Sequence, residues 1–126
     1  MKLIKVYHGS KLQNFDASYF VSPRYKLMVL FASSNLKLAA NYANSHSTGA
    51  LYSFEIPKPT LDIDFEFKDT YSSHSFRTLI YKNIANHKII RFKNCFDSPN
   101  IKKTAGIYAD IYVISDFDLI SNIQRL

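Results

Sequence analysis

Short runs of apolar and β-branched residues, separated by polar turns, predict a chain built mainly of β-strands. We expect strands at 3–8, 27–32, 50–56, 61–67, 88–92 and 107–114. The run at 27–32 is almost entirely apolar, which suits a strand covered on both faces. The run at 61–67 alternates apolar and acidic residues, which predicts a strand with one face in solvent.

Two segments carry apolar residues at helical spacing, so we expect helices at 35–44 and 72–85. The first follows hydroxyl and amide residues that can cap a helix, and its apolar face is expected to be Leu36, Ala39, Ala40 and Ala43. The apolar face of the second is expected to be Phe76, Leu79, Ile80 and Ile84. Residues 11–26 and 94–105 are expected to be irregular, and 116–126 to be a short helix or an edge strand.

This order of elements predicts an α+β fold with a mixed or antiparallel sheet, because strands and helices do not alternate as in a βαβ array. The chain has 126 residues, of which 47% are hydrophobic, and this size predicts a single domain over 1–126. Its one cysteine, Cys95, excludes an intrachain disulfide, and the scattered histidines do not have zinc-ligand spacing, so no metal site is expected.

The chain shows no signal-peptide pattern and no apolar run long enough to span a bilayer, so we expect no membrane association. A cytoplasmic location is expected, with host cytoplasm after delivery by injection left open. The net charge is +6, which favours a nucleotide or an acidic protein or nucleic-acid target as partner. The basic residues are spread along the chain, however, and an AT-rich coding bias would also explain them.

Three segments are candidates for chemistry. In the first, Tyr7-His8-Gly9-Ser10, a histidine ends a strand beside a glycine, so His8 can donate to a ribose hydroxyl while the Gly9 backbone pairs with a planar amide. The second is the strand at 30–32, which leads through Ser33 and Ser34 into the helix that carries Tyr42. The third is the strand 110–114, which begins with Asp110. Taken singly, each residue is as well explained by ordinary packing, and Asp110 by a hydrogen bond to a turn.

Together and in this order, the three segments resemble the ADP-ribosyltransferase superfamily, and specifically its His-Tyr-Glu branch. That branch includes the poly(ADP-ribose) polymerases and small bacterial and phage relatives. Its first motif is His-Gly-Ser or His-Gly-Thr after a strand, which His8, Gly9 and Ser10 match. The resemblance covers nearly the whole chain. It implies two small sheets, split apart and flanked by two main helices, with NAD as a substrate in the cleft between them.

The resemblance also implies roles for individual residues. His8 and Asp110 would be catalytic, with His8 positioning a ribose and Asp110 supporting the oxocarbenium-like transition state. Gly9 would clamp the carboxamide with support from Ser10, Tyr42 would stack on a ring, and Phe31 would line the site. Arg24, in the loop between the first two motifs, would contact the pyrophosphate. A solvated loop charge is the other explanation for Arg24.

Two positions depart from the family pattern. Leu30 stands where the family has a tyrosine, and Asp110 stands where it has a glutamate. An aspartate is one methylene shorter, and a carboxylate misplaced by about 1 Å can cost ~100-fold in rate.

The leading interpretation is a mono-ADP-ribosyltransferase of the kind that phages or toxins use, modifying a protein or a nucleic acid. The alternative is an inactive module of the same fold that binds a nucleotide or inhibits a host protein. RNA 2′-phosphotransferase chemistry is a third interpretation, which needs further His and Arg residues that the sequence does not place.

Overall fold

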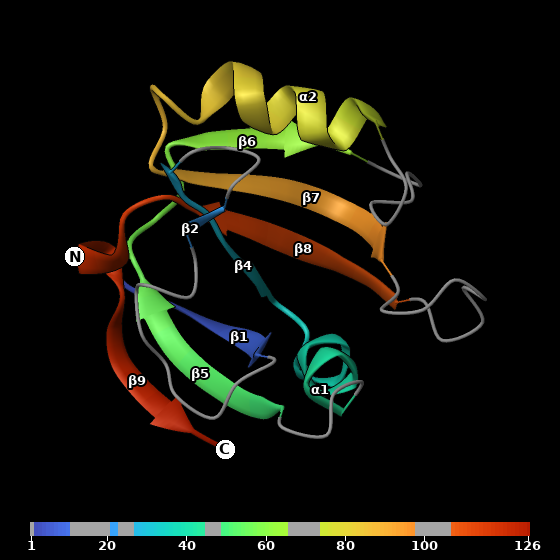
Figure 1. Cartoon of the computed structure of the whole chain (residues 1–126), viewed down its shortest axis with the longest axis vertical. Coiled ribbons are helices and arrows are strands. Elements are labelled where there is room, and N and C mark those ends of the chain that lie inside the picture. The colour runs from blue at the N-terminus through green and yellow to red at the C-terminus, as the bar shows by residue number, and fades with distance from the viewer. Residues whose placement is uncertain (1, 11–20, 23–26, 45–48, 66–73, 98–106) are drawn as a thin grey trace.

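The computed structural model describes residues 2–10, 21–22, 27–44, 49–65, 74–97 and 107–126. Within these residues, seven strands form one sheet in the order β6-β7-β8-β4-β1-β5-β9 (Figure 1). Their bounds are Leu61–Asp64 (β6), Ile89–Asp97 (β7), Ile107–Ile114 (β8), Leu30–Ser33 (β4), Ile4–Ser10 (β1), Ala50–Ile56 (β5) and Ser121–Arg125 (β9). Two short strands, β2 (Val21–Ser22) and β3 (Leu27–Met28), form a separate antiparallel pair. Because β6 and β7 are parallel and the other neighbours antiparallel, the expected α+β class with a mixed sheet is confirmed.

Among the described strands of the sheet, β1 and β4 share the fewest registered residue pairs. Along its other edge, β1 is registered with β5 over its full length, from Ile4 opposite Ile56 to Ser10 opposite Ala50. Toward β4, the described residues show one registered pair, Tyr7 with Ser33. Figure 1 shows β4 crossing between the upper strands and the group β1, β5 and β9. The strands are therefore one sheet with a single junction between two halves, rather than two separate sheets.

Two clusters of buried side chains lie on opposite faces of this sheet. Alternate residues of β8 enter different clusters, since Ile111 and Val113 pack under α2 (His74–Asn83) whereas Tyr112 and Ile114 pack on the other face. The second cluster joins the two halves, because it also contains Val6 and Phe54. Side-chain packing in the second cluster therefore joins the two halves where strand pairing is sparse.

Helix α1 (Leu36–Asn44) begins where the capping residues predicted it. The Asn35 side-chain oxygen accepts a hydrogen bond from the Leu38 amide at 3.2 Å, and the Ser33 hydroxyl accepts one from the Asn35 amide at 2.9 Å. The expected apolar face is wrong at one position. Leu36 is 46% exposed, and Leu38 takes the buried place beside Ala39 and Ala43.

Two other expectations need correction, and a third is met in both of its forms. The apolar run 27–32 is divided between β3 and β4 and is not covered on both faces, because the Phe31 side chain is 40% exposed. Strand β7 continues to Asp97, so Asn94 to Asp97 are strand and not an irregular excursion. The end of the chain contains both expected forms, a 3₁₀ turn at Phe117–Leu119 followed by the edge strand β9.

Candidate functional site

His8 lies on β1 beside the junction with β4. Its Nδ1 atom is 2.6 Å from the Phe31 carbonyl oxygen on β4. A carbonyl can only accept, so Nδ1 carries the proton and donates it. In the neutral ring the buried Nε2 is then an acceptor. The expectation that His8 donates to a ribose hydroxyl is therefore reversed, since this tautomer accepts a hydrogen bond from such a hydroxyl.

Burial keeps His8 neutral. Desolvation lowers the pKa of His8 from 6.5 to about 4, and the hydrogen bond to the Phe31 carbonyl opposes this only in part. At neutral pH the imidazole is therefore an uncharged group with a fixed tautomer. It can orient a hydroxyl, but it does not supply a positive charge to a phosphate.

Because folded His8 stays neutral, the free energy of unfolding depends on pH. Between pH 6.5 and about 4 the unfolded chain binds a proton that folded His8 does not bind, so stability falls as pH falls through that window. We expect a loss on the order of 3 kcal/mol in the free energy of unfolding. Urea unfolding at a series of pH values measures it. His8→Asn, whose amide N–H can still donate to the Phe31 carbonyl, lacks this component, and equal pH profiles for the two proteins would contradict the assignment.

Gly9 is required by packing. A Cβ built on Gly9 would lie 2.6 Å from the Ala43 amide nitrogen, 2.9 Å from the Tyr42 Cβ, and closer still to the Ala39 carbonyl oxygen. The face of Gly9 is thus occupied by helix α1 and is not open to a ligand. Toward β4, the one described residue registered against β1 is Ser33, opposite Tyr7. Ser10, next in the chain, is buried.

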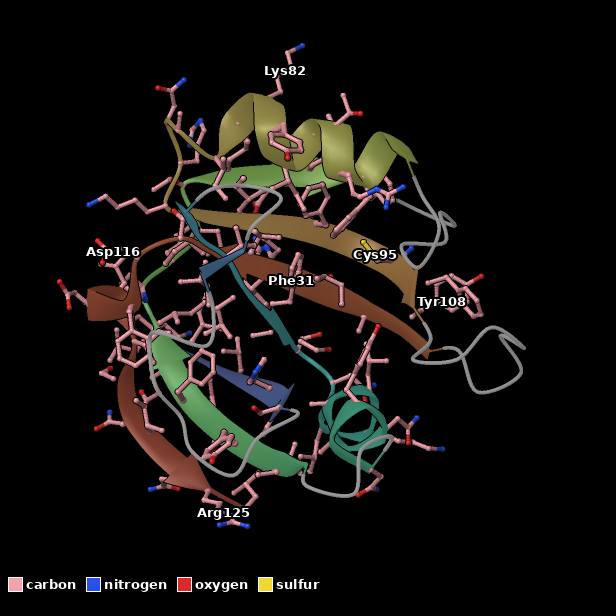
Figure 2. All side chains as sticks on the ribbon, viewed as in Figure 1. Phe31, Lys82, Cys95, Tyr108, Asp116 and Arg125 are labelled. Atoms are coloured by element: carbon pink, nitrogen blue, oxygen red, sulfur yellow. The ribbon has the colours of Figure 1, made fainter. Side chains whose placement is uncertain are left out.

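The two aromatic candidates differ in exposure. Tyr42 is partly buried and packs against the cluster under α2, with its Cβ beside Gly9. Phe31 is 40% exposed, and its ring lies 6.2 Å from that of Phe76 at an interplanar angle of 29°. Figure 2 shows Phe31 in the middle of the molecule, on β4. Of the two, Phe31 is the ring that a ligand can reach.

Asp110 is held by residues on both sides of β8. On the β4 side, its amide donates to the Ser34 hydroxyl at 3.1 Å, and its carbonyl accepts from the Ser34 amide at 3.0 Å. On the β7 side, its carboxylate Oδ1 accepts from the Asn94 amide at 3.0 Å. Asn94 has a positive φ of 56° within the bulge of β7. The structure therefore shows Asp110 in the alternative role, as a residue that hydrogen-bonds an irregular backbone segment.

The structure brings some of the expected site residues together. His8, Gly9 and Ser10 are consecutive on β1, where the His8 ring contacts the Phe31 carbonyl of β4, and Asp110 is one strand further away, on β8. Tyr42 reaches Gly9 from α1. Arg24 lies outside the described residues. Leu30, at the position of the family tyrosine, is fully buried and offers nothing to a ligand.

Ser34 and Asn94 are site neighbours that sequence reasoning missed. Ser34 appeared only as a capping residue, and Asn94 as the start of an irregular segment. The one signal in the sequence was Asn94 itself, since asparagine tolerates positive φ better than most residues. Its pairing with Asp110, 16 positions later, depends on the register of β7 and β8.

The charge of Arg91 on β7 is neutralised by an ion pair. Arg91 donates two hydrogen bonds of 2.8 Å to the Asp62 carboxylate, and this contact lowers the pKa of Asp62 and raises that of Arg91. Lys93 is registered opposite Asp64 in the same strand pair. The described part of β7 therefore offers little net positive charge to an acidic target.

Neither a metal centre nor a reactive thiol is found in the described part of the chain. No group of three or more His, Cys, Asp or Glu residues there could hold a metal ion. Cys95 is fully buried, and its thiol donates to the Phe92 carbonyl at 3.5 Å. Among the described helices, none is long and apolar enough to cross a membrane.

Comparison of the sequence with models of protein families found no matching family, and comparisons with curated proteins and with solved structures found no match.

Proposed function

We propose that this chain binds NAD at the junction of β1 and β4 and transfers its ADP-ribose to an acceptor on a protein or a nucleic acid. The observation that carries the proposal is the fixed tautomer of His8. Its Nδ1–H is held by the Phe31 carbonyl, and burial keeps the ring neutral, so Nε2 accepts from a ribose hydroxyl. A neutral histidine oriented in this way suits a nucleoside better than a phosphate.

The remaining roles follow the resemblance. The Gly9 backbone, on the side of β1 that faces β4, would pair with the carboxamide of nicotinamide. The bond between the ribose C1′ and the nicotinamide nitrogen breaks, nicotinamide leaves with the electron pair, and the acceptor nucleophile bonds to C1′. Asp110 would stabilise the positive charge that develops on the ribose and take the proton of the acceptor.

A second candidate function is nucleotide binding without turnover. The hydrogen bond of Asp110 Oδ1 to the Asn94 amide favours it, because Asn94 belongs to β7 and His8 lies on the opposite side of β8. A carboxylate drawn toward β7 and short by one methylene is poorly placed to reach a ribose held by His8. Asp110 is then a structural residue and the site is a receptor for the nucleotide.

Nicotinamide release from NAD separates the two functions. Wild type is compared with His8→Asn, which keeps the donor to Phe31 but has no Nε2, and with Asp110→Asn, which keeps an acceptor for Asn94 but has no charge. For a transferase we expect both substitutions to lower the release rate by about 100-fold or more, since each removes a group that acts on the transition state. Asp110→Glu restores the missing methylene and is expected to raise the rate above that of wild type.

The same proteins are heated with and without NAD. Protection of wild type without nicotinamide release would establish the binding module, because a ligand that binds only the folded state raises its melting temperature. If wild type neither releases nicotinamide from NAD nor is protected by NAD against heat, NAD is not the ligand of this site.

A further inference from the structure

The outer surface of α2 carries positive charge without acidic residues to balance it. From residue 70 to residue 96 the sequence contains no aspartate or glutamate, and within that stretch α2 contributes Arg77 and Lys82. Among the described residues, the two carboxylates in ion pairs, Asp62 and Asp116, bind cations outside α2. Figure 2 shows Lys82 extending from α2 away from the sheet.

The sheet keeps the acidic residues of β6 on its other side. In β6, Leu61 and Ile63 pack against the buried cluster under α2. Successive side chains of a strand point to opposite faces, so Asp62 and Asp64 lie on the face away from α2. There Asp62 is bound to Arg91. Among the described residues, cations therefore dominate the electrostatic potential on the α2 side of this half of the sheet.

An exposed aromatic ring lies beside these cations. Tyr81 is 51% exposed, whereas Phe76 and Ile80 of the same helix are buried. Residues four apart are neighbours on a helix surface, so Tyr81 shares a flank of α2 with Arg77, and Lys82 is next in the chain. Proteins that bind single-stranded nucleic acid combine the same two kinds of group, cations for the phosphates and a flat ring for an unstacked base.

This combination favours single-stranded nucleic acid over other anionic partners. The bases of a duplex are stacked on one another, so an exposed ring gains nothing from them. A helix that lies on an anionic membrane presents a broad apolar face to it, whereas the apolar face of α2 is buried in the cluster under it. An acidic protein segment would be held by the cations alone and would make no use of Tyr81.

We propose that the face of α2 formed by Arg77, Tyr81 and Lys82 binds single-stranded nucleic acid. The two cations neutralise phosphates, and Tyr81 stacks on a base. Binding there is independent of the NAD site. Val6 belongs to the buried cluster on the opposite face of the sheet from α2, so the side chain of His8, two residues further along β1, lies on that opposite face. The α2 face therefore anchors a nucleic acid to the protein without forming part of the NAD site.

The cations are tested by the anisotropy of a fluorescein-labelled oligothymidylate, titrated with the full chain at several salt concentrations and without NAD. For wild type we expect binding that weakens as salt rises. Arg77→Gln combined with Lys82→Gln is expected to lower the slope of log affinity against log salt by about 1.4, since each phosphate contact to a single strand contributes about 0.7. Lys2→Gln combined with Lys37→Gln removes the same charge from two exposed positions outside α2 and is expected to keep the wild-type slope.

The ring is tested in the same titration by Tyr81→Leu. We expect its affinity to fall at least about fivefold, the low end of what base–aromatic stacking contributes, with the salt slope unchanged because stacking releases no ions. Tyr108→Leu is the matched control, since Tyr108 is also 51% exposed but lies on β8. It is expected to keep the wild-type affinity.

Each outcome supports or overturns the inference. An equal loss of slope in the Lys2 and Lys37 variant would show that the net charge of the chain binds the oligonucleotide, and would overturn the assignment to α2. Unchanged affinity in Tyr81→Leu, or tighter binding of labelled polyglutamate than of the oligonucleotide, would overturn single-stranded nucleic acid as the partner. Absence of binding by wild type would overturn the inference outright. Because NAD is absent, none of these results bears on the proposed function, and a chain that does not bind NAD can still support the inference.

Discussion

Gly9→Ala is expected to lower the free energy of unfolding by about 3 kcal/mol or more, which is a large part of the stability of a typical domain. The added methyl group would collide with the Ala39 carbonyl oxygen and with the Ala43 nitrogen of α1. Both are backbone atoms, so no change of side-chain rotamer relieves the contact. Either α1 must move away from β1 or β1 must shift in its pairing with β5.

Urea unfolding measures this loss, and Lys5→Ala provides the matched control. Lys5 is exposed on the same strand and is expected to change stability by no more than about 0.5 kcal/mol. Because α1 also carries Tyr42 and β1 carries His8, Gly9→Ala should weaken NAD protection as well. A Gly9→Ala protein as stable as Lys5→Ala would show that α1 does not lie against β1 as described.

Phe92→Ala is expected to cost about 3–5 kcal/mol, the largest effect of a single truncation that we predict. Phe92 is fully buried, and its ring lies 4.5 Å from that of Phe76 and 5.6 Å from that of Phe65. Removing the ring leaves a cavity beside two aromatic side chains, Phe65 and Phe76. Phe76 also packs against the exposed ring of Phe31, so the loss of Phe92 weakens the support of that ring.

Denaturant unfolding of Phe92→Ala is compared with that of Phe92→Leu, which fills most of the space. The leucine variant is expected to lose about 1.5 kcal/mol. Similar stabilities for the alanine and leucine variants would contradict the packing of Phe92 as the centre of this aromatic cluster.

The elements that could be predicted from the sequence are those whose pattern is local. Strands β5 and β8 have the expected bounds, because each is a compact apolar run bounded by turn residues. Helix α1 was predicted from its caps and small residues. Its buried face was predicted at Ala39 and Ala43 but not at Leu38. Leu36 and Leu38 are equally apolar, and only the direction from which β1 and the cluster under α2 approach decides between them.

The candidate site shows the same limit. The motif around His8 could be found in the sequence, but the tautomer of its ring depends on the Phe31 carbonyl, 23 residues away. The exposure of Phe31 contradicts the pattern of its own segment, because a hydrophobic run gives no sign of which member is left uncovered. The direction of the Asp110 carboxylate depends on the bulge at Asn94, which is a feature of strand pairing and not of composition.

The single pair between Tyr7 and Ser33 has a mechanical consequence. A continuous ladder of hydrogen bonds resists separation over its whole length, whereas a seam with one registered pair can widen at the cost of few bonds. We therefore expect the sheet to deform most easily along the line between β1 and β4, where His8 contacts the Phe31 carbonyl, and least within the strand pairs on either side. We expect any change in the width of the candidate site to occur along that seam, without disturbing the pairing that holds each half together.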